Sequence, residues 1–310
     1  MLSRVADSLY WMSRYMERTD GILRMLKINY ASSQDDSHEF TWRPVLKIFS
    51  HLDDTEISKL EKNNGVLQFM VVDKENPDSV LNMVTQSREN ARSVQDHITK
   101  ELWQSLNEFY HIVRDDKLER FLKMEDPITV LDSLIREGVL YYGTAEITMS
   151  RGEGMCFMNI GKYLERAIQS ADILDVKFSD LSFTLDKTTD TTYWKYLLLS
   201  ISGYELYLKN YRSGFEARNI MDQILFDSNF PRSVLYSVSQ LQHYFERLKN
   251  DHNLASFETV RFMIGRICSK VQFSNVQSVS EVGLHTYLKQ LKQELNDVGK
   301  VLTQLYFAYT

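Results

Sequence analysis

The residues of this sequence that could do chemistry are arginines and carboxylates at helical spacing. A row near the start of the chain recurs every three or four residues: Arg4, Asp7, Trp11, Arg14 and Arg18. That spacing places the row on one side of a helix, with Glu17 next to its last member. The row is either an exposed face with one tryptophan or a covered face, where each arginine needs a carboxylate partner. The chemistry of a covered row would be anion binding, because the planar guanidinium group fits carboxylates and phosphates.

A second set of the same residue types follows about 70 residues later: Arg88, Glu89, Arg92, Asp96, Glu101 and Trp103. We expect the two sets to meet in one polar cluster of six side chains: Arg14, Glu17, Arg18, Arg88, Glu89 and Arg92. Its arginines outnumber its glutamates, so two positive charges lack a partner. An acidic peptide end or a phosphate would complete the cluster. Alternatively, Asp7, Asp96 or Glu101 supplies the missing charge.

Long helices must position these side chains. One apolar stripe alternates spacings of three and four and predicts a first helix of about 29 residues: Leu2, Val5, Leu9, Met12, Met16, Thr19, Leu23, Leu26 and Tyr30. A second stripe has the same alternation: Phe157, Ile160, Leu164, Ala167, Ala171, Leu174 and Phe178. The second stripe repeats the phase of the first 148 residues later, and Glu17-Arg18 returns as Glu165-Arg166.

Two further matches support an internal repeat. The residues around Trp42 correspond to those around Trp194, at an offset of 152. The pattern Asp-x3-Pro-x-Ser-Val-Leu occurs at 73–81 and again at 227–235, at an offset of 154. Proline and serine both suit the first turn of a helix, so we interpret this pattern as a helix-start device and not as a catalytic loop. Collinear matches of this kind predict a duplicated unit.

The predicted fold is all-α. It is a helical bundle built from two duplicated multi-helix units, related by a pseudo-two-fold axis and packed as one body. Residues 1–120 form the first unit, 121–150 a connecting helical segment and 151–310 the second unit. In the first unit a long helix is predicted from about Asp78 to Arg114, and the last helix of the chain from Leu284 to Tyr309.

The composition agrees with this fold and excludes several functions. Twelve glycines and 4 prolines in 310 residues are too few for the turns of a β-sandwich or a β-barrel. A net charge of −6 argues against nucleic-acid binding. No apolar run reaches the ~18 residues of a membrane span, and the charged start does not resemble a signal peptide. We therefore expect a cytoplasmic protein.

The sequence predicts no cofactor and no metal site. A di-iron bundle needs two Glu-x-x-His motifs, and only Glu108 and His111 form one, since Glu281 and His285 are four residues apart. The two cysteines, Cys156 and Cys268, lie in apolar surroundings and are expected to behave as small hydrophobic residues. The Arg-Gly-Glu-Gly turn at 151–154 is interpreted as a helix start and not as a phosphate loop.

The motifs together resemble the bacterial alpha-E family, named for a predicted helical domain with a Glu-Arg motif. The resemblance covers nearly the whole chain and rests on these segments: Met1-Leu2-Ser3-Arg4-Val5-Ala6, Leu9-Tyr10-Trp11-Met12, Arg14-Tyr15-x-Glu17-Arg18, Ser87-Arg88-Glu89-Asn90-Ala91-Arg92, Glu101-x-Trp103, Gly161-x-Tyr163-Leu164-Glu165-Arg166 and Phe230-Pro231-Arg232-Ser233-Val234. Two positions depart from the family pattern, Thr19-Asp20 and Ile168, and the second weakens a two-fold use of the carboxylates. The resemblance places Glu165, Arg166 and Arg232 at the edge of the predicted cluster.

The resemblance to this family implies a partner protein and not a particular reaction. Genes of this family typically neighbour, or are fused to, a circularly permuted ATP-grasp protein, often near peptidase genes. Three hypotheses follow from this. The chain is a binding or scaffold subunit that holds an acidic peptide or a phosphate-bearing ligand and works with an ATP-grasp ligase. Alternatively, it is an enzyme of amide or peptide chemistry that uses Glu17, Glu89, Glu101 or Glu165, or a structural bundle with buried Glu-Arg pairs.

Overall fold

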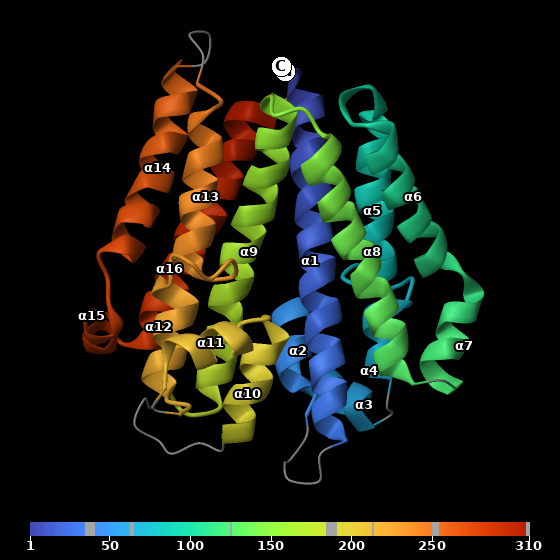
Figure 1. The fold of residues 1–310 in the computed structure, drawn as a ribbon, viewed down its shortest axis with the longest axis vertical. Coiled ribbons are helices and arrows are strands. Elements are labelled where there is room, and N and C mark those ends of the chain that lie inside the picture. The colour runs from blue at the N-terminus through green and yellow to red at the C-terminus, as the bar shows by residue number, and fades with distance from the viewer. Residues whose placement is uncertain are drawn as a thin grey trace. The chain divides into compact units, whose positions relative to one another are not determined.

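The described part of the chain is entirely helical. A computed structural model describes residues 1–34, 41–62, 65–124, 126–183, 191–212, 214–249 and 254–307. These residues form sixteen α-helices, one 3-10 turn and one π-helical turn (Figure 1), and no strand occurs among them. The prediction of an all-α fold is therefore confirmed.

The helices belong to two compact units, and each unit is described by itself. The 11–150 unit contains Trp11–Ser150, and the 151–310 unit contains Arg151–Thr310 together with Met1–Tyr10, so the division falls inside α1 (Ser3–Ser33). After α1, the helices of the 11–150 unit are α2 (Arg43–Phe49), α3 (Asp54–Lys62), α4 (Val66–Val71), α5 (Val80–Ser93), η1 (Gln95–His97), α6 (Lys100–Arg114), α7 (Asp116–Met124) and α8 (Pro127–Thr148).

The 151–310 unit is built around its first helix, α9. Its helices are α9 (Glu153–Ser179), α10 (Thr191–Ser200), α11 (Tyr204–Asn210), α12 (Ala217–Phe226), α13 (Val234–Glu246), α14 (Leu254–Gln272), α15 (Val276–Val282), α16 (Leu284–Leu302) and η2 (Thr303–Phe307). α9 packs against α13 and α16, and α14 packs against the same two helices. Aromatic rings join these elements, since Phe307 lies 6.0 Å from Phe157 and 5.1 Å from Tyr10 between ring centroids. These contacts form the apolar core of the unit.

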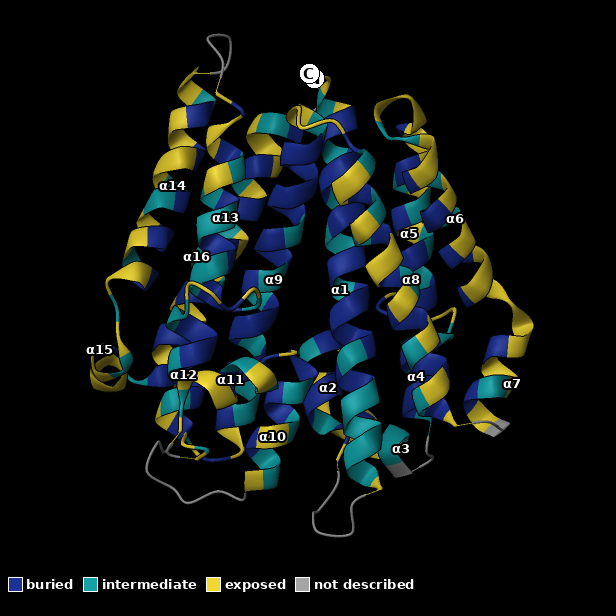
Figure 2. Ribbon diagram, viewed as in Figure 1, coloured by how far each residue is buried: buried dark blue, intermediate teal, exposed yellow. Residues whose placement is uncertain are grey.

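The two predicted apolar stripes are buried, except for Leu2 and Tyr30 at the two ends of the first stripe. Val5, Leu9, Met12, Met16 and Leu26 of α1 are all at most 4% exposed. All seven members of the 157–178 stripe are also in the core, and Figure 2 shows buried positions along most of α9. The helical periodicity of both segments is therefore confirmed. α1 begins one residue after the first member of its stripe and ends three residues beyond the last, and α9 extends beyond its stripe at both ends.

The repeated Asp-x3-Pro-x-Ser pattern starts a helix in both places. Ser79 and Ser233 are the N-caps of α5 and α13, and each hydroxyl accepts the backbone N–H three residues later. The aspartates also act alike, since the carboxylates of Asp73 and Asp227 each accept the N–H two residues later at 2.8 Å. The serines satisfy amides that the first turn of a helix leaves unpaired, and the aspartates satisfy amides of the turn that precedes it. The helix-start interpretation is confirmed, although the first helical residue follows the serine and not the proline.

The predicted long helix from Asp78 to Arg114 is wrong. The chain forms α5, the short η1 and then α6, and α6 packs back against α5. The interruption has a local cause. Ile98 is extended, and Thr99 caps α6 by accepting the N–H of Leu102 at 3.2 Å, which makes a new start more favourable than continuation. The last helix also differs, because its α-helical part ends at Leu302 and a π-helical turn follows. Residues 308–310 lie outside the described residues.

The serine caps give the first testable prediction. Ser79→Ala and Ser233→Ala each remove the acceptor of an otherwise unpaired amide, so each should lower the free energy of unfolding by about 1 kcal/mol. Chemical unfolding followed by circular dichroism measures the change. Ser93→Ala, at the exposed end of α5, is the control and should have little effect. A cap variant as stable as this control would contradict the assignment.

Candidate functional site

α1 presents a row of polar side chains to α8 within the 11–150 unit. Its members are spaced by four and three residues: Ser13, Glu17, Asp20, Arg24 and Lys27. The Ser13 and Tyr141 hydroxyls lie 3.3 Å apart, the Tyr142 hydroxyl donates to Glu17 Oε2 at 2.7 Å, and Lys27 Nζ lies 2.6 Å from Asp132 Oδ1. We call these eight residues the α1–α8 polar row. These pairs fix the register between α1 and α8, because a sliding of one helix along the other would separate the paired groups.

The carboxylates of this row are buried. Glu17 is 0% exposed and Asp20 is 3% exposed. Arg24 Nε donates to both oxygens of Asp20, at 3.0 and 2.9 Å. Burial acts to lower the pKa of Arg24, but the charge and hydrogen bonds of Asp20, with the nearby charge of Glu17, outweigh it and raise that pKa. The part of the row around Glu17 and Asp20 is therefore an internal network of charged and hydrogen-bonded groups, and the pair of Lys27 and Asp132 at its end is half-buried.

The arginines on the other side of α1 are half-buried. Arg18 Nη2 lies 3.2 Å from Asp78 Oδ1, in the turn that precedes α5, and His51 Nε2 lies 3.6 Å from the other oxygen of Asp78. The Arg14 guanidinium lies 4.8 Å from the centroid of the Trp11 ring. Asp78, which was not among the predicted carboxylates, therefore supplies a partner charge for Arg18.

The residues predicted on the second segment form a separate set on α5 and α6. We define the arginine face by its members: Arg88, Glu89, Arg92, Trp103, Asn107, Tyr110 and Arg114. Arg88 Nη1 donates to Glu89 Oε1 at 2.7 Å and Arg88 Nε donates to Asn107 Oδ1 at 2.8 Å. Arg92 Nη1 lies 3.6 Å from the other oxygen of Glu89. One carboxylate is thus shared by two guanidinium groups.

Aromatic rings support the same face. The guanidinium of Arg88 lies 4.4 Å from the Tyr110 ring centroid and 5.4 Å from that of Trp103. Arg114 donates to the Tyr110 hydroxyl and lies 5.6 Å from the same ring. Arg88 is only 18% exposed at its side chain, whereas Arg92 is 64% exposed. The face combines a fixed inner arginine with a solvent-accessible outer one.

The predicted single cluster is therefore two sets. Among the described residues, Arg88, Glu89 and Arg92 make no ion pair or hydrogen bond with Arg14, Glu17 or Arg18. The sets are separate because α5 turns its polar strip toward α6, while the contact of α5 with α1 is made by Ser87, whose hydroxyl donates to the Met12 carbonyl at 3.0 Å. Glu101 is exposed in the first turn of α6 and belongs to neither set.

The remaining predicted residues lie in the 151–310 unit. Glu165 is 2% exposed and accepts a hydrogen bond from Gln169 at 3.4 Å. Arg166 Nη1 donates to the Pro231 carbonyl at 3.2 Å, and the carbonyl of Arg232 accepts the Ser170 hydroxyl at 2.7 Å. The contacts of Arg166 and Ser170 tie α9 to the turn before α13, whereas the hydrogen bond of Glu165 with Gln169 lies within α9 itself. Their predicted place at the edge of the α1 cluster stays a prediction.

The described residues hold no group of three or more histidine, cysteine, aspartate or glutamate side chains arranged to hold a metal ion. Glu108 and His111 are both exposed on α6. Cys156 and Cys268 are buried and free, and burial raises the pKa of the Cys156 thiol, which agrees with their expected role as small hydrophobic residues. None of the helices described is long and apolar enough to cross a membrane.

Sequence reasoning missed several residues of these sets. Asp20, Arg24 and Lys27 continue the three-and-four spacing of Ser13 and Glu17, so their common face was readable from the sequence. The partners on other helices were not, because nothing in the spacing along one helix says which helix faces it. These partners are Asp78, Asp132, Tyr141 and Tyr142.

Comparison with known proteins assigns the chain to one group. A model of a family described as a predicted alpha-helical domain with a conserved ER motif matches residues 1–307. An uncharacterised protein of Mycobacterium bovis is 23% identical over 332 residues, which is 98% of this chain and 37% of that protein. Uncharacterised proteins of two Mycobacterium tuberculosis strains match with the same identity and coverage. The chain thus spans little more than a third of the length of these relatives. No solved structure matches it.

The hydrogen bond between Tyr142 and Glu17 gives the second prediction. Tyr142→Phe removes a donor from a fully buried carboxylate and should lower the free energy of unfolding by about 1–3 kcal/mol. Tyr30→Phe is the matched control, because the Tyr30 hydroxyl of α1 makes no hydrogen bond with any described residue. Equal stabilities of the two variants in urea unfolding would contradict the role of Tyr142.

The third prediction concerns alkaline pH. Burial raises the pKa of Tyr141 far above its ordinary value of 10.0, so the unfolded chain loses this proton at a lower pH than the folded one. The stability from this group is fully present below about pH 10 and is lost as the pH rises further, by up to about 1.4 kcal/mol per pH unit. Tyr141→Phe should therefore show a shallower fall in the free energy of unfolding between pH 9 and 11 than the unsubstituted chain. An equal fall in the free energy of unfolding in both proteins over this pH range would contradict the prediction.

Proposed function

This chain belongs to the Alpha-E family, and we propose that it is a binding or scaffold subunit whose arginine face takes an anionic group of a partner. The observation that carries the proposal is a local excess of positive charge. Arg88, Arg92 and Arg114 have one carboxylate among them, that of Glu89, and Arg114 makes no ion pair with any described residue. A set that only tied helices together would be expected to balance its charges.

The face is also accessible and pre-organised. Arg92 projects into solvent, while Arg88 is held by Asn107 and by the rings of Trp103 and Tyr110. A guanidinium that is already fixed loses less conformational entropy on binding, and its planar group can donate two hydrogen bonds to a carboxylate or phosphate. These properties suit the acidic end of a peptide or a phosphate-bearing ligand.

The proposed partner is an ATP-grasp ligase, and the proposed process is the formation or modification of peptide or amide bonds in the cytoplasm. The resemblance to the family suggests this partner. The lengths of the mycobacterial relatives support the scaffold role. The region that matches this chain is 37% of each relative, so in those proteins it is joined to a much longer polypeptide. A domain that occurs within a larger chain in relatives is a natural binding subunit for a separate protein.

The Glu-Arg pairs at 17–18 and 165–166 fit the hypothesis that these pairs stabilise the helical bundle. Glu17 and Glu165 are both almost fully buried and hydrogen-bonded, which suits carboxylates that hold helices in register. A buried carboxylate is poorly placed to act on a large substrate. We therefore propose that the motif is a structural element and that binding takes place at the arginine face.

We also propose that the chain arose by duplication. The turns at 73–79 and 227–233 make matching aspartate and serine hydrogen bonds. In each unit the arginine of the Glu-Arg pair contacts the turn before the serine-capped helix, Arg18 through Asp78 and Arg166 through the Pro231 carbonyl, both at 3.2 Å. These parallels support the repeat, and the pseudo-two-fold axis and the 1–120, 121–150 and 151–310 boundaries are part of the same proposal.

The fourth prediction tests the arginine face. Arg92→Ala should change the free energy of unfolding by less than about 1 kcal/mol, because its ion pair is solvent-exposed. Together with Arg88→Ala it should weaken binding of an oligoglutamate peptide, and of the ATP-grasp protein encoded in the same genome, by about tenfold or more. Calorimetric titration measures both affinities.

Arg136→Ala is the matched control, because Arg136 is an exposed arginine of α8 without an ion pair to the described residues. Equal binding by the double variant and the control would overturn the proposal. So would a loss of stability of about 3–5 kcal/mol in Arg92→Ala, since that loss belongs to a buried structural ion pair.

A further inference from the structure

One face of α8 exposes apolar side chains to solvent in the 11–150 unit. Val139, Leu140 and Ile147 are 54%, 49% and 83% exposed. Together with the exposed Gly143 they recur at spacings of three and four residues, so they form one strip along the helix, and Figure 2 shows exposed positions along α8. We call these four residues the α8 strip. A Cβ atom added at Gly143 would meet nothing from neighbouring elements within 4 Å, so the middle of the strip is open to a partner.

A cavity lies between α6, α7 and α8, about two turns of α8 before the strip. Its volume is about 300 Å³, and most of the side chains that line it are apolar: Ile112 of α6, Leu118 and Phe121 of α7, and Val130 and Leu134 of α8. Ile112 is itself 36% exposed. The cavity can accept a large apolar side chain of a partner, which is how anchor residues bind at protein interfaces.

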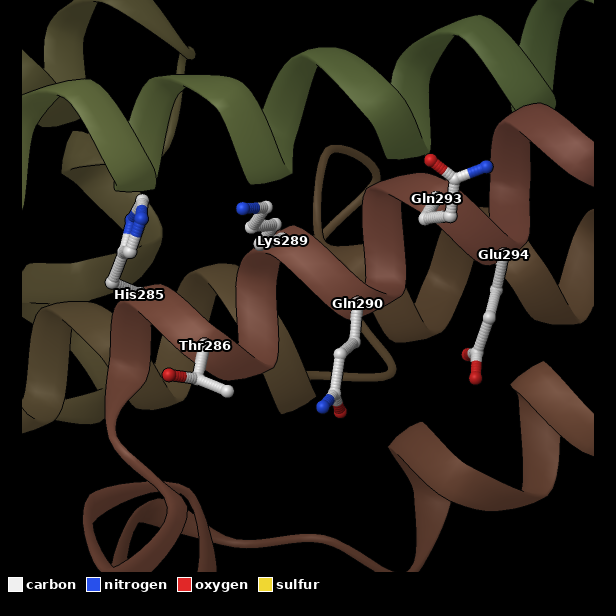
Figure 3. Close-up of a pocket in the computed structure, with 6 residues that line it drawn as sticks. All are labelled: His285, Thr286, Lys289, Gln290, Gln293 and Glu294. Atoms are coloured by element: carbon white, nitrogen blue, oxygen red, sulfur yellow. The ribbon is translucent and has the colours of Figure 1, made fainter.

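The groove along α16 in the other unit differs in its chemistry. Figure 3 shows the side chains that line it, which are all polar or charged: His285, Thr286, Lys289, Gln290, Gln293 and Glu294. Its volume of about 560 Å³ is larger, but none of these six side chains could hold an apolar anchor. Apolar contact therefore favours the surface of α6, α7 and α8 for docking.

Two carboxylates lie between the cavity and the α8 strip. Glu137 follows the cavity residue Ser133 by one turn of α8, and Glu108 occupies the turn of α6 before Ile112. Burial raises the pKa of Glu137, and the nearby charge of Glu108 raises it further. Neither carboxylate makes an ion pair or hydrogen bond with any described residue, the exposed Arg136 of α8 included. A cation from a partner would relieve a repulsion that these described residues leave unbalanced.

We propose that this surface binds an amphipathic helix of a partner protein that carries a basic flank. One large apolar side chain of that helix occupies the cavity, its other apolar residues pack on the α8 strip, and its lysine or arginine residues lie beside Glu108 and Glu137. From Ser133 to Ile147, α8 spans about 21 Å, the length of a helix of about 14 residues. Charge selects this occupant, because a second copy of the chain carries a net charge of −6 and an anionic membrane surface is also negative.

The surface is separate from the arginine face, although α6 contributes to both. Helical spacing places Glu108 and Ile112 on one side of α6 and Tyr110 and Arg114 on another. The proposal uses no residue of the arginine face, so it does not rest on the function proposed above. Arg88→Ala together with Arg92→Ala should therefore leave binding of a basic helix within about twofold.

Fluorescence anisotropy with the full chain tests the proposal. The probe is a labelled helical peptide of about 18 residues, with leucines at spacings of three and four and lysines along one flank. A second peptide has glutamates in place of the lysines. The lysine peptide should bind saturably with a Kd below about 100 μM, and the glutamate peptide about tenfold more weakly or worse. No saturable binding of the lysine peptide, or equal affinities of the two peptides, would overturn the proposal.

A pair of apolar substitutions locates the binding surface. Leu140→Ser with Ile147→Ser should weaken binding of the lysine peptide about tenfold or more. The matched control is Phe262→Ser with Phe273→Ser, because these side chains of the 151–310 unit are 70% and 82% exposed, and it should leave binding within about twofold. Equal losses in the two pairs would place the peptide elsewhere and overturn the proposal.

A pair of charge substitutions separates the surface from general attraction between a basic peptide and an acidic chain. Glu108→Gln with Glu137→Gln should weaken binding about fivefold or more. Glu75→Gln with Glu205→Gln changes the net charge equally at exposed positions and should leave binding within about twofold. Equal losses would overturn the proposal. Sedimentation velocity of the chain alone adds a further check, because a dimer that Leu140→Ser with Ile147→Ser dissociates would show that a second copy occupies the strip, and that result would also overturn it.

Discussion

The burial of carboxylates on α1 is the constraint on which the 11–150 unit depends. Glu17 and Asp20 are almost completely removed from solvent, and an unpaired ion in such a place costs several kcal/mol. Their partners come from α1 itself and from α8, through Arg24 and Tyr142. A shift of α8 by one turn would separate Tyr142 from Glu17 and Asp132 from Lys27 at once. The polar row thus selects one register where apolar packing alone would tolerate several.

The same constraint explains why the Glu-Arg motif is a poor candidate for a reaction centre. Glu17 accepts a hydrogen bond from Tyr142 of α8, Glu165 accepts one from Gln169 of its own helix, and the arginines of both motifs contact the turns before α5 and α13. Those turns carry the serine caps, so each motif joins a long helix to the start of the helix that packs beside it. Conserving this geometry requires both charge and hydrogen-bonding capacity, which a pair of apolar residues cannot supply.

Functional chemistry is then left to side chains at the edges of the units. On the arginine face of α5 and α6 an inner arginine is fixed and an outer arginine is exposed to solvent. Arg88 is held by aromatic rings and by Asn107, and Arg92 is the exposed member. This arrangement on an open surface supports the proposal that the face binds the anionic group of a macromolecule.

The sequence by itself determined the helical class, the long helices α1 and α9 and the caps that start α5 and α13, because these depend on spacing and on contacts within a few residues. The sequence also indicated that the charged residues around Glu17 and Arg88 lie on helix faces that pair with other charged groups. Only the tertiary structure decided that they form two sets, that Asp78 pairs with Arg18, and that α5 and α6 are separate helices. The physical reason is the same in each case. Helical periodicity says which side chains share a face, whereas the partner of that face lies far away in the sequence and is chosen by packing.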